Sequence, residues 1–299
     1  MNNNSYIFNF NMKIFIKKTL TFFGLFTLLL IVFLSLRIEK TLNVRWKLSK
    51  NINTLFLGAS HIQRGINDSI YIGGFNLADG SERYLFTYLK LKNLLASNSN
   101  IDSVFLEFAP TDIWLNTDSK YYSSNEMSKF LPMYFPFFSW EEWKVYMKMG
   151  KIKVLSFIGQ KALKNIPKDI SDFGGFSPSN RIFNSSLDKY TARDWAERGH
   201  KINYKYLEKI TALCYEKKIK LIFIYMPMYR PENFYDQKYY YSTYKKQFSN
   251  VELLDFSGWD CPDSLRADEH HLNSIGANRF TKMLYDSIKK PRFSNNKFY

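Results

Sequence analysis

An uncharged apolar run near the N-terminus constrains this chain more than any other feature of its sequence. Residues 19–36 read TLTFFGLFTLLLIVFLSL. As an α-helix the run would be roughly 27 Å long, close to the thickness of the hydrocarbon core of a bilayer. A cleaved signal peptide is the alternative, but its apolar part would be shorter and would end at a small-x-small site, which does not follow Leu36. We therefore expect an uncleaved transmembrane signal anchor at residues 19–36.

Basic residues flank this run on both sides. Cations next to a membrane span are attracted to anionic lipid headgroups. A short tail, residues 1–18, before a single span suits an N-terminus in the cytoplasm, so the rest of the chain would lie outside it. Residues 37–50 are then expected to be a juxtamembrane linker. The chain has a formal net charge of +15, but the cations beyond residue 50 form no basic block. We therefore expect the bilayer as a partner and no nucleic acid.

The remainder of the chain alternates between short apolar runs and helical patterns. Five runs have the length and composition of buried strands: Asn53–Ala59, Phe75–Ala78, Ser103–Phe108, Leu221–Met226 and Val251–Phe256. Helical spacing of apolar residues is found between them and after Ser274. This alternation predicts an α/β fold over residues 51–290, a three-layer sandwich with a mostly parallel five-stranded sheet. Ligands of such sheets bind at the carboxyl ends of the strands.

A long stretch, residues 111–200, interrupts this alternation between the third and fourth predicted strands. It contains Trp114, Trp140, Trp143 and the run FLPMYFPFF at residues 130–138. We predict a helical, aromatic-rich insertion. It would serve either as a local hydrophobic subcore or as a lid or glycan platform, since aromatic rings stack on sugars. The polar end of the chain, residues 291–299, is expected to be frayed.

Two short stretches carry residues suited to catalysis. Ser60 lies in the sequence GASH directly after the first predicted strand, where a sharp turn would expose its hydroxyl at the edge of the sheet. It could instead only cap the next helix. Asp268 and His271 lie three residues apart in DEHHLN, before the last helix. In a loop, this carboxylate can orient the imidazole, which can then take a proton from the serine.

The same histidine-rich loop has two other interpretations. Its histidines could simply form hydrogen bonds within the loop, or they could bind a metal together with the nearby carboxylates. No second cluster of His or Cys supports a metal site, and the chain has only two cysteines. We therefore expect neither a metal nor a cofactor.

Together the two stretches resemble the first and last conserved blocks of the SGNH/GDSL hydrolase superfamily. The first block is matched by LGASH at residues 57–61, and the last by DEHHLNSIGANRFT at residues 268–281. The resemblance implies an SGNH/flavodoxin-like fold with Ser60 as nucleophile, His271 as general base and Asp268 as its orienting carboxylate. It also implies an oxyanion hole formed by the N–H groups of Ser60 and Gly80, with Asn76 as a further donor.

The third block of the superfamily is where this sequence departs. Its usual asparagine, an oxyanion donor, should follow the third strand, but residues 107–112 read EFAPTD. Thr111 is the candidate substitute, and His61, Thr111 and Asp112 are possible substrate contacts. Membrane-anchored members similar to the teichoic-acid D-alanylation and alginate O-acetylation proteins also depart from the standard blocks.

The resemblance and the anchor lead to one functional hypothesis and one alternative. The hypothesis is an extracytoplasmic serine O-acyltransferase or esterase that acts on acyl groups of a bacterial cell-envelope polysaccharide. It would work beside a multi-spanning membrane acyltransferase. Addition and removal of an acyl group need the same three side chains, so the sequence does not separate them. The alternative is a non-catalytic glycan-binding or scaffolding module of an envelope polysaccharide-modification complex.

Overall fold

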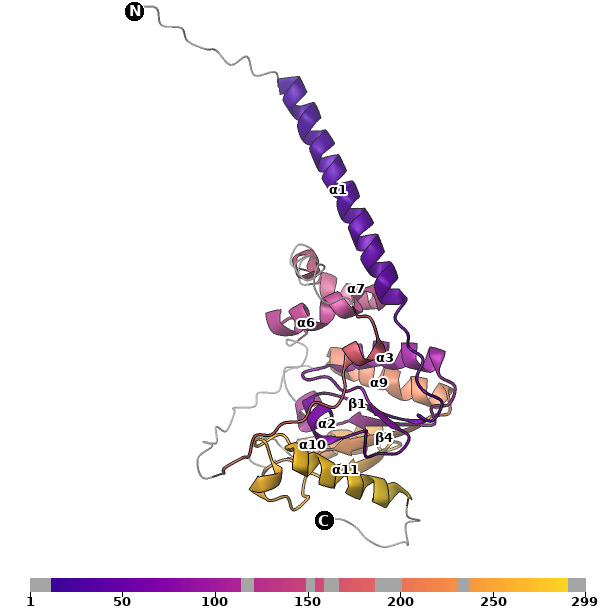
Figure 1. The fold of residues 1–299 in the computed structure, drawn as a ribbon, viewed down its shortest axis with the longest axis vertical. Coiled ribbons are helices and arrows are strands. Elements are labelled where there is room, and N and C mark those ends of the chain that lie inside the picture. Colours follow the sequence, from indigo (N-terminus) through magenta and orange to yellow (C-terminus); the bar gives the residue numbers. More distant parts are fainter. Residues whose placement is uncertain are drawn as a thin grey trace, which may run out of the picture.

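A single parallel sheet forms the centre of the protein (Figure 1). The computed structural model describes residues 12–113, 121–148, 154–158, 167–185, 201–230 and 237–289. The strands are β1 (Thr54–Leu57), β2 (Gly74–Asn76), β3 (Ser103–Glu107), β4 (Lys220–Tyr225) and β5 (Glu252–Asp255), in the order β2-β1-β3-β4-β5. Every neighbouring pair is parallel. The predicted five-stranded α/β fold is confirmed, and all five predicted strands lie within a few residues of their expected positions.

Helices cover both faces of this sheet. Helices α3 (Tyr84–Ser97) and α9 (Lys201–Glu216) pack against each other in one layer, and α2 (Ser60–Gly65) contacts α11 (Ser274–Lys289) in the other. Side chains alternate between the faces of a strand. Leu55 and Leu57 of β1 therefore join the hydrophobic cluster under α3 and α9, whereas Phe56 joins the cluster under α2 and α11. The result is the predicted three-layer arrangement.

The N-terminal helix α1 (Met12–Leu42) is longer than the predicted span, because residues on both sides of the uncharged run continue the helix. By length and composition it can cross a membrane, although a signal sequence would satisfy the same criteria. Its apolar side chains are exposed along most of its length, but its last turns pack on the rest of the protein. Arg37 and Thr41 are buried, and Leu34 and Ile38 contact the main hydrophobic cluster.

Residues 37–50, predicted as a juxtamembrane linker, pack against the rest of the protein: the first of them continue α1, and the segment after α1 is part of the core. Val44, Trp46 and Leu48 are buried, whereas the residues between them are exposed. The side chain of Asn98 fixes this segment, since its Nδ2 donates to the carbonyl of Trp46 at 2.6 Å and its Oδ1 accepts from the N–H of Leu48 at 2.7 Å. Helix α1 is therefore joined to the sheet by packed structure.

The described parts of the insertion are largely helical. They comprise α4 (Pro110–Ile113), α6 (Ser124–Tyr134), η1 (Phe135–Phe137), α7 (Trp140–Met147), a short helix at 154–158 and η2 (Ile170–Phe173). Phe130 stacks on Phe86 of α3 with ring centroids 4.8 Å apart, and Tyr134 contacts Phe173. The described insertion therefore extends the core beneath α3. Trp114, the remainder of the insertion and the expected frayed end at 291–299 lie outside the described residues.

The rest of the chain completes the edge of the sheet near β4 and β5. It forms α10 (Gln237–Thr243), the π-helical turn η4 (Tyr244–Phe248) and the 3-10 turn η5 (Asp263–Leu265). Tyr240 donates its hydroxyl hydrogen to the carbonyl of Phe108 at 2.8 Å, which ties α10 to the residue that follows β3.

A buried ion pair between α3 and the residue Glu82 before it makes a testable contribution to stability. The Nζ of Lys90 lies 2.6 Å from Glu82 Oε2, and both side chains are inaccessible to solvent. Burial raises the pKa of Glu82 to about 7 despite the nearby lysine. We expect Lys90→Met to lower the free energy of unfolding by about 3–5 kcal/mol, because it leaves a buried carboxyl group without its cation.

The double variant Lys90→Met, Glu82→Gln should recover part of this loss. Urea unfolding of the full chain in detergent, followed by circular dichroism, measures both values. Equal stability of the wild type and Lys90→Met would contradict the prediction.

Candidate active site

The turn between β1 and α2 positions Ser60 at the carboxyl edge of the sheet. Gly58 has φ 145°, and a Cβ atom there would lie 2.3 Å from the Cβ of Glu107, so this position requires glycine. Ser60 is the first residue of α2. Its N–H group therefore has no acceptor within the helix and stays available for a ligand.

The structure brings together Ser60, His271 and Asp268, three of the residues singled out in the sequence. Ser60 Oγ lies 2.8 Å from His271 Nε2, and His271 Nδ1 lies 2.7 Å from Asp268 Oδ1. Asp268 Oδ1 also accepts hydrogen bonds from the N–H groups of His270 and His271, at 2.9 and 3.0 Å. This connectivity is the one through which a serine, a histidine and an aspartate act together in acyl transfer.

The surroundings hold Asp268 ionised and His271 neutral. Burial alone would raise the pKa of Asp268, but hydrogen bonds from the His271 side chain and from the backbone outweigh it and hold the pKa well below its usual value. Burial lowers the pKa of His271, the cation of His61 lowers it further, and Asp268 only partly opposes the shift. A neutral imidazole beside the serine hydroxyl can accept its proton.

Ser60 and Gly80, whose N–H groups are the expected oxyanion donors, lie next to each other. A Cβ atom built at Gly80 would lie 4.0 Å from the Cβ of Ser60, so the two residues are neighbours. Within the described ranges, the N–H groups of Ser60 and Gly80 donate to no protein acceptor. The Gly80 turn is held by Lys129 of α6, whose Nζ contacts Asp79 Oδ1 at 2.7 Å and the Gly80 carbonyl at 2.8 Å.

The expectation that Asn76 donates to an oxyanion is wrong. Its amide nitrogen donates to the carbonyls of Ile62 and Ile66, at 3.1 and 2.7 Å, and its Oδ1 accepts from the N–H of Ala78. The side chain is 1% exposed. Asn76 therefore fixes the end of β2 against α2, and its N–H groups are not directed toward Ser60.

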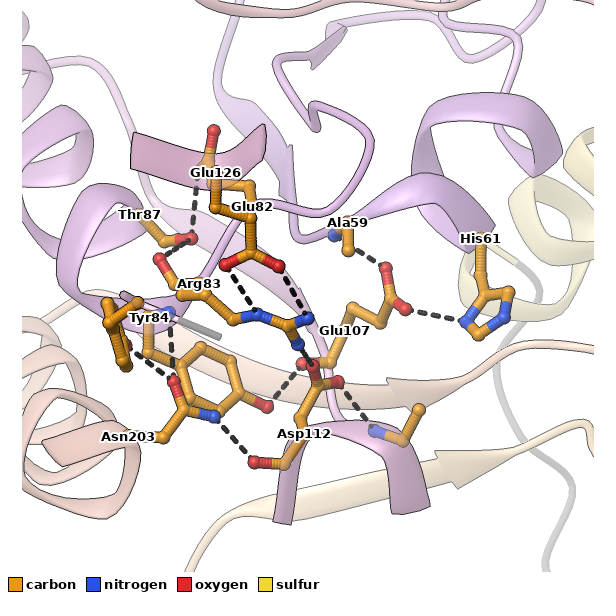
Figure 2. Close-up of polar contacts among 12 residues, drawn as sticks. Ala59, His61, Glu82, Arg83, Tyr84, Thr87, Glu107, Asp112, Glu126 and Asn203 are labelled. Atoms are coloured by element: carbon orange, nitrogen blue, oxygen red, sulfur yellow. Dashed lines mark hydrogen bonds and ion pairs between the residues drawn. The ribbon is translucent and has the colours of Figure 1, made fainter. Parts of the chain in front are cut away.

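Glu107, the last residue of β3, is the important side chain that sequence reasoning did not select. Its Oε2 accepts from the N–H of Ala59 at 2.7 Å, and its Oε1 lies 2.6 Å from His61 Nδ1 (Figure 2). Burial would raise its pKa, but His61 and the backbone donors of Ala59 and Ile62 lower it instead. An acidic residue at the end of the apolar run SVFLE was the available signal, because such a residue is rarely buried without a partner.

Charged side chains continue from Glu107 into the insertion. Arg83 lies between two carboxylates, 3.1 Å from Glu126 and 3.8 Å from Asp112 (Figure 2). Burial and the nearby Glu107 raise the pKa of Asp112 to about 7. Asp112 is 5% exposed, so its expected contact with substrate is not supported.

The other two expected substrate contacts differ in their surroundings. His61 is 8% exposed and faces Glu107, so at most its outer edge can reach a ligand. Thr111 is half-buried on α4, and its contact with substrate stays a prediction. Across the described part of the chain, no group of three or more His, Cys, Asp or Glu side chains is arranged to hold a metal ion.

Comparison with known proteins gives a weak likeness to solved structures. No protein-family model matches the sequence, and no curated protein matches it. One similar structure is a "putative acylhydrolase" from Bacteroides fragilis, 10% identical, covering 84% of this chain and 95% of its own, with a TM-score of 0.38. Another is a GDSL-like lipase from Bacteroides thetaiotaomicron, 10% identical, with the same coverage and a TM-score of 0.37.

The rings of His61 and His271 lie close enough for a charge on His61 to change the pKa of His271. The ring centroids of His61 and His271 lie 5.3 Å apart. Burial lowers the pKa of His61, but Glu107 more than compensates, so the pKa is raised and the cation is favoured. We expect His61→Gln to raise the pKa of His271, because a neutral amide that can still bond Glu107 replaces a nearby positive charge.

The measurement is an NMR titration of the full chain labelled with ¹³C-histidine. The acid form of His271 should then persist to higher pH in the variant than in the wild type. An unchanged or lowered pKa of His271 would show that the charge on His61 does not act on it.

Proposed function

We propose that this chain is a membrane-anchored serine acyl-transfer enzyme of the SGNH type, with Ser60 as its nucleophile. The observation that carries the proposal is the hydrogen-bonded chain from Ser60 through His271 to Asp268 at the carboxyl edge of a parallel sheet. A serine hydroxyl is a weak nucleophile by itself, and an adjacent base held in place by a third group activates it. His271, which is neutral and within hydrogen-bonding distance of Ser60, suits the role of the base. Asp268, which is ionised and bonded to His271, suits the role of the group that holds the base in place.

The reaction would proceed in two steps through an acyl-enzyme. His271 Nε2 takes the proton of Ser60 as Oγ attacks the carbonyl carbon of an ester, and Asp268 stabilises the imidazolium that forms. The tetrahedral intermediate collapses as the ester C–O bond breaks, and His271 protonates the leaving alkoxide. The acyl group then rests on Ser60 until water or a glycan hydroxyl, deprotonated by His271, attacks it. The bond between the acyl carbon and Ser60 Oγ breaks, and His271 returns the proton to Oγ.

The oxyanion hole of this mechanism has two assigned donors, the N–H groups of Ser60 and Gly80. The carboxylate of Glu107 accepts hydrogen bonds from Ala59 and Ile62, so it donates none to an oxyanion. One donor of this kind typically contributes about 2.7–4 kcal/mol to stabilisation of the transition state.

The membrane part of the proposal rests on α1. Its uncharged run has the length of a span, and the packing of Arg37 and Thr41 into the protein favours a retained anchor over a cleaved signal. With a cytoplasmic N-terminus, the site would face the cell envelope. An envelope polysaccharide is then the natural acyl acceptor or acyl-bearing substrate, with a multi-spanning membrane acyltransferase as the source of acyl groups.

The proposal predicts that Ser60→Ala abolishes acyl turnover without unfolding the protein. Loss of the nucleophile should lower kcat/KM for a chromogenic acetyl ester by about 10⁴-fold or more. Because the residues act as a unit, adding His271→Ala should cost little further activity. Ser69→Ala is the matched control, since Ser69 is exposed and, among the residues that the structure describes, its recorded hydrogen bond is through its backbone N–H. A folded, fully active Ser60→Ala protein would refute the mechanism.

Mass spectrometry of the same reactions identifies the type of enzyme. Acetyl on Ser60 in the wild type, absent from Ser60→Ala, would identify the serine acyl-enzyme. Acylation of an added oligosaccharide would indicate a transferase, and release of acetate alone an esterase. Glycan binding without an adduct, in membranes that also contain the partner acyltransferase, would favour the non-catalytic module.

A further inference from the structure

The insertion lies at the level where the uncharged run of α1 ends. Leu34, inside that run, and Ile38, just beyond it, both pack against the main hydrophobic cluster, and α1 contacts η1. Between them, Arg37 donates from Nη2 to the carbonyl of Pro132 at 3.1 Å. Leu34 is only about 3 Å of helix rise before the end of the run. If α1 spans a bilayer, α6 and η1 therefore reach the boundary between headgroups and hydrocarbon.

Helix α7, which follows η1, presents a mixed apolar and basic face to solvent. Trp140, Lys144, Met147 and Lys148 lie within one narrow sector of the helix and are all exposed, whereas Glu142 and Tyr146 on the opposite side are buried. Trp140 is 66% exposed, which is unusual for so large an apolar side chain. Tryptophan combined with lysine is the composition that proteins place at the membrane–water interface.

A second exposed apolar side chain lies near α7 in the chain. Leu155, in the short helix at residues 154–158, is 60% exposed, whereas Val154 and Ile158 of the same helix are buried. Figure 1 shows this short helix and α7 on the side of the domain from which α1 projects, whereas α11 lies on the opposite side. The two helices that carry Trp140 and Leu155 are therefore on the side that would face a bilayer.

We propose that α7 and the helix at 154–158 form a membrane-contact surface, defined by Trp140, Lys144, Met147, Lys148 and Leu155, that rests on the bilayer beside α1. The proposal rests on the membrane anchoring within the proposed function and extends it. The occupant is the lipid interface, because the surface continues from a helix of span length and pairs apolar side chains with cations. Trp140 and Leu155 enter the interface, and the two lysines meet anionic headgroups.

Attachment through both α1 and the membrane-contact surface would fix the orientation of the domain, which a single anchor does not. A domain held only by a flexible linker swings about its anchor, whereas here α1 is packed into the core and the insertion contacts the same membrane. The carboxyl edge of the sheet, with Ser60, is then held at a fixed height and orientation above the bilayer. Such an arrangement suits a substrate that is itself presented at the membrane surface.

The experiment uses the full chain reconstituted in vesicles of phosphatidylethanolamine and phosphatidylglycerol. These contain a lipid with a photoreactive diazirine near the headgroup, and peptide mapping by mass spectrometry locates the adducts. We expect labelling of α1, and labelling of the α7 peptide about tenfold above that of α11. Label on α1 with α7 at the level of α11 would overturn the inference and leave the anchor intact. Absence of label from α1 would overturn the membrane part of the proposed function as well.

A pair of variants tests the surface itself. Trp140→Glu should reduce labelling of the α7 peptide about tenfold while label on α1 is unchanged, because a carboxylate disfavours the anionic interface. Tyr215→Glu is the matched control, since Tyr215 is 86% exposed on α9 and lies outside the surface. Equal labelling of the α7 peptide in the two variants would contradict the proposal. Both substitutions are on exposed side chains, so the fold should persist, and circular dichroism verifies it.

Discussion

The buried carboxylate of Glu107 is the interaction on which the arrangement of the site depends. Its Oε2 holds the N–H of Ala59, and its Oε1 pairs with His61, so one side chain fixes the turn that carries Ser60. A carboxylate this deeply buried is tolerated only with partners of this kind. Gly58 leaves the space that the side chain needs. The position of the serine therefore depends on the end of β3 as much as on its own strand.

The same carboxylate connects the site to the insertion. Asp112 lies near Glu107, Arg83 bridges Asp112 to Glu126 of α6, and the adjacent Lys129 holds the turn of Gly80. Helix α6 is in turn contacted by Arg37 at the base of α1, through the carbonyl of Pro132. The insertion thus lies between α1 and the site and packs against both. This continuity explains why it shares the hydrophobic core of the main domain.

Much of the fold followed from the pattern of the sequence. The five apolar runs became the five strands because a parallel sheet buried on both faces needs continuous apolar residues. Ser60, Asp268 and His271 could be selected from local patterns alone. Ser60 follows directly after a predicted strand, and Asp268 and His271 lie three residues apart in a loop before a helix. Asn76 was misjudged, since a side chain beside a predicted turn can point either toward the site or into the core.

The sequence by itself determined the long apolar helix, the strands and the identity of the three side chains that meet in the site. Each of these depends on composition and spacing over a few residues. The tertiary structure decided the rest. Glu107 and His61 are 46 residues apart, and only the parallel pairing of β1 with β3 brings them together. The burial of Val44, Trp46 and Leu48 likewise depends on Asn98 and on the insertion. Contacts across such separations depend on the packing of distant segments, which local patterns do not encode.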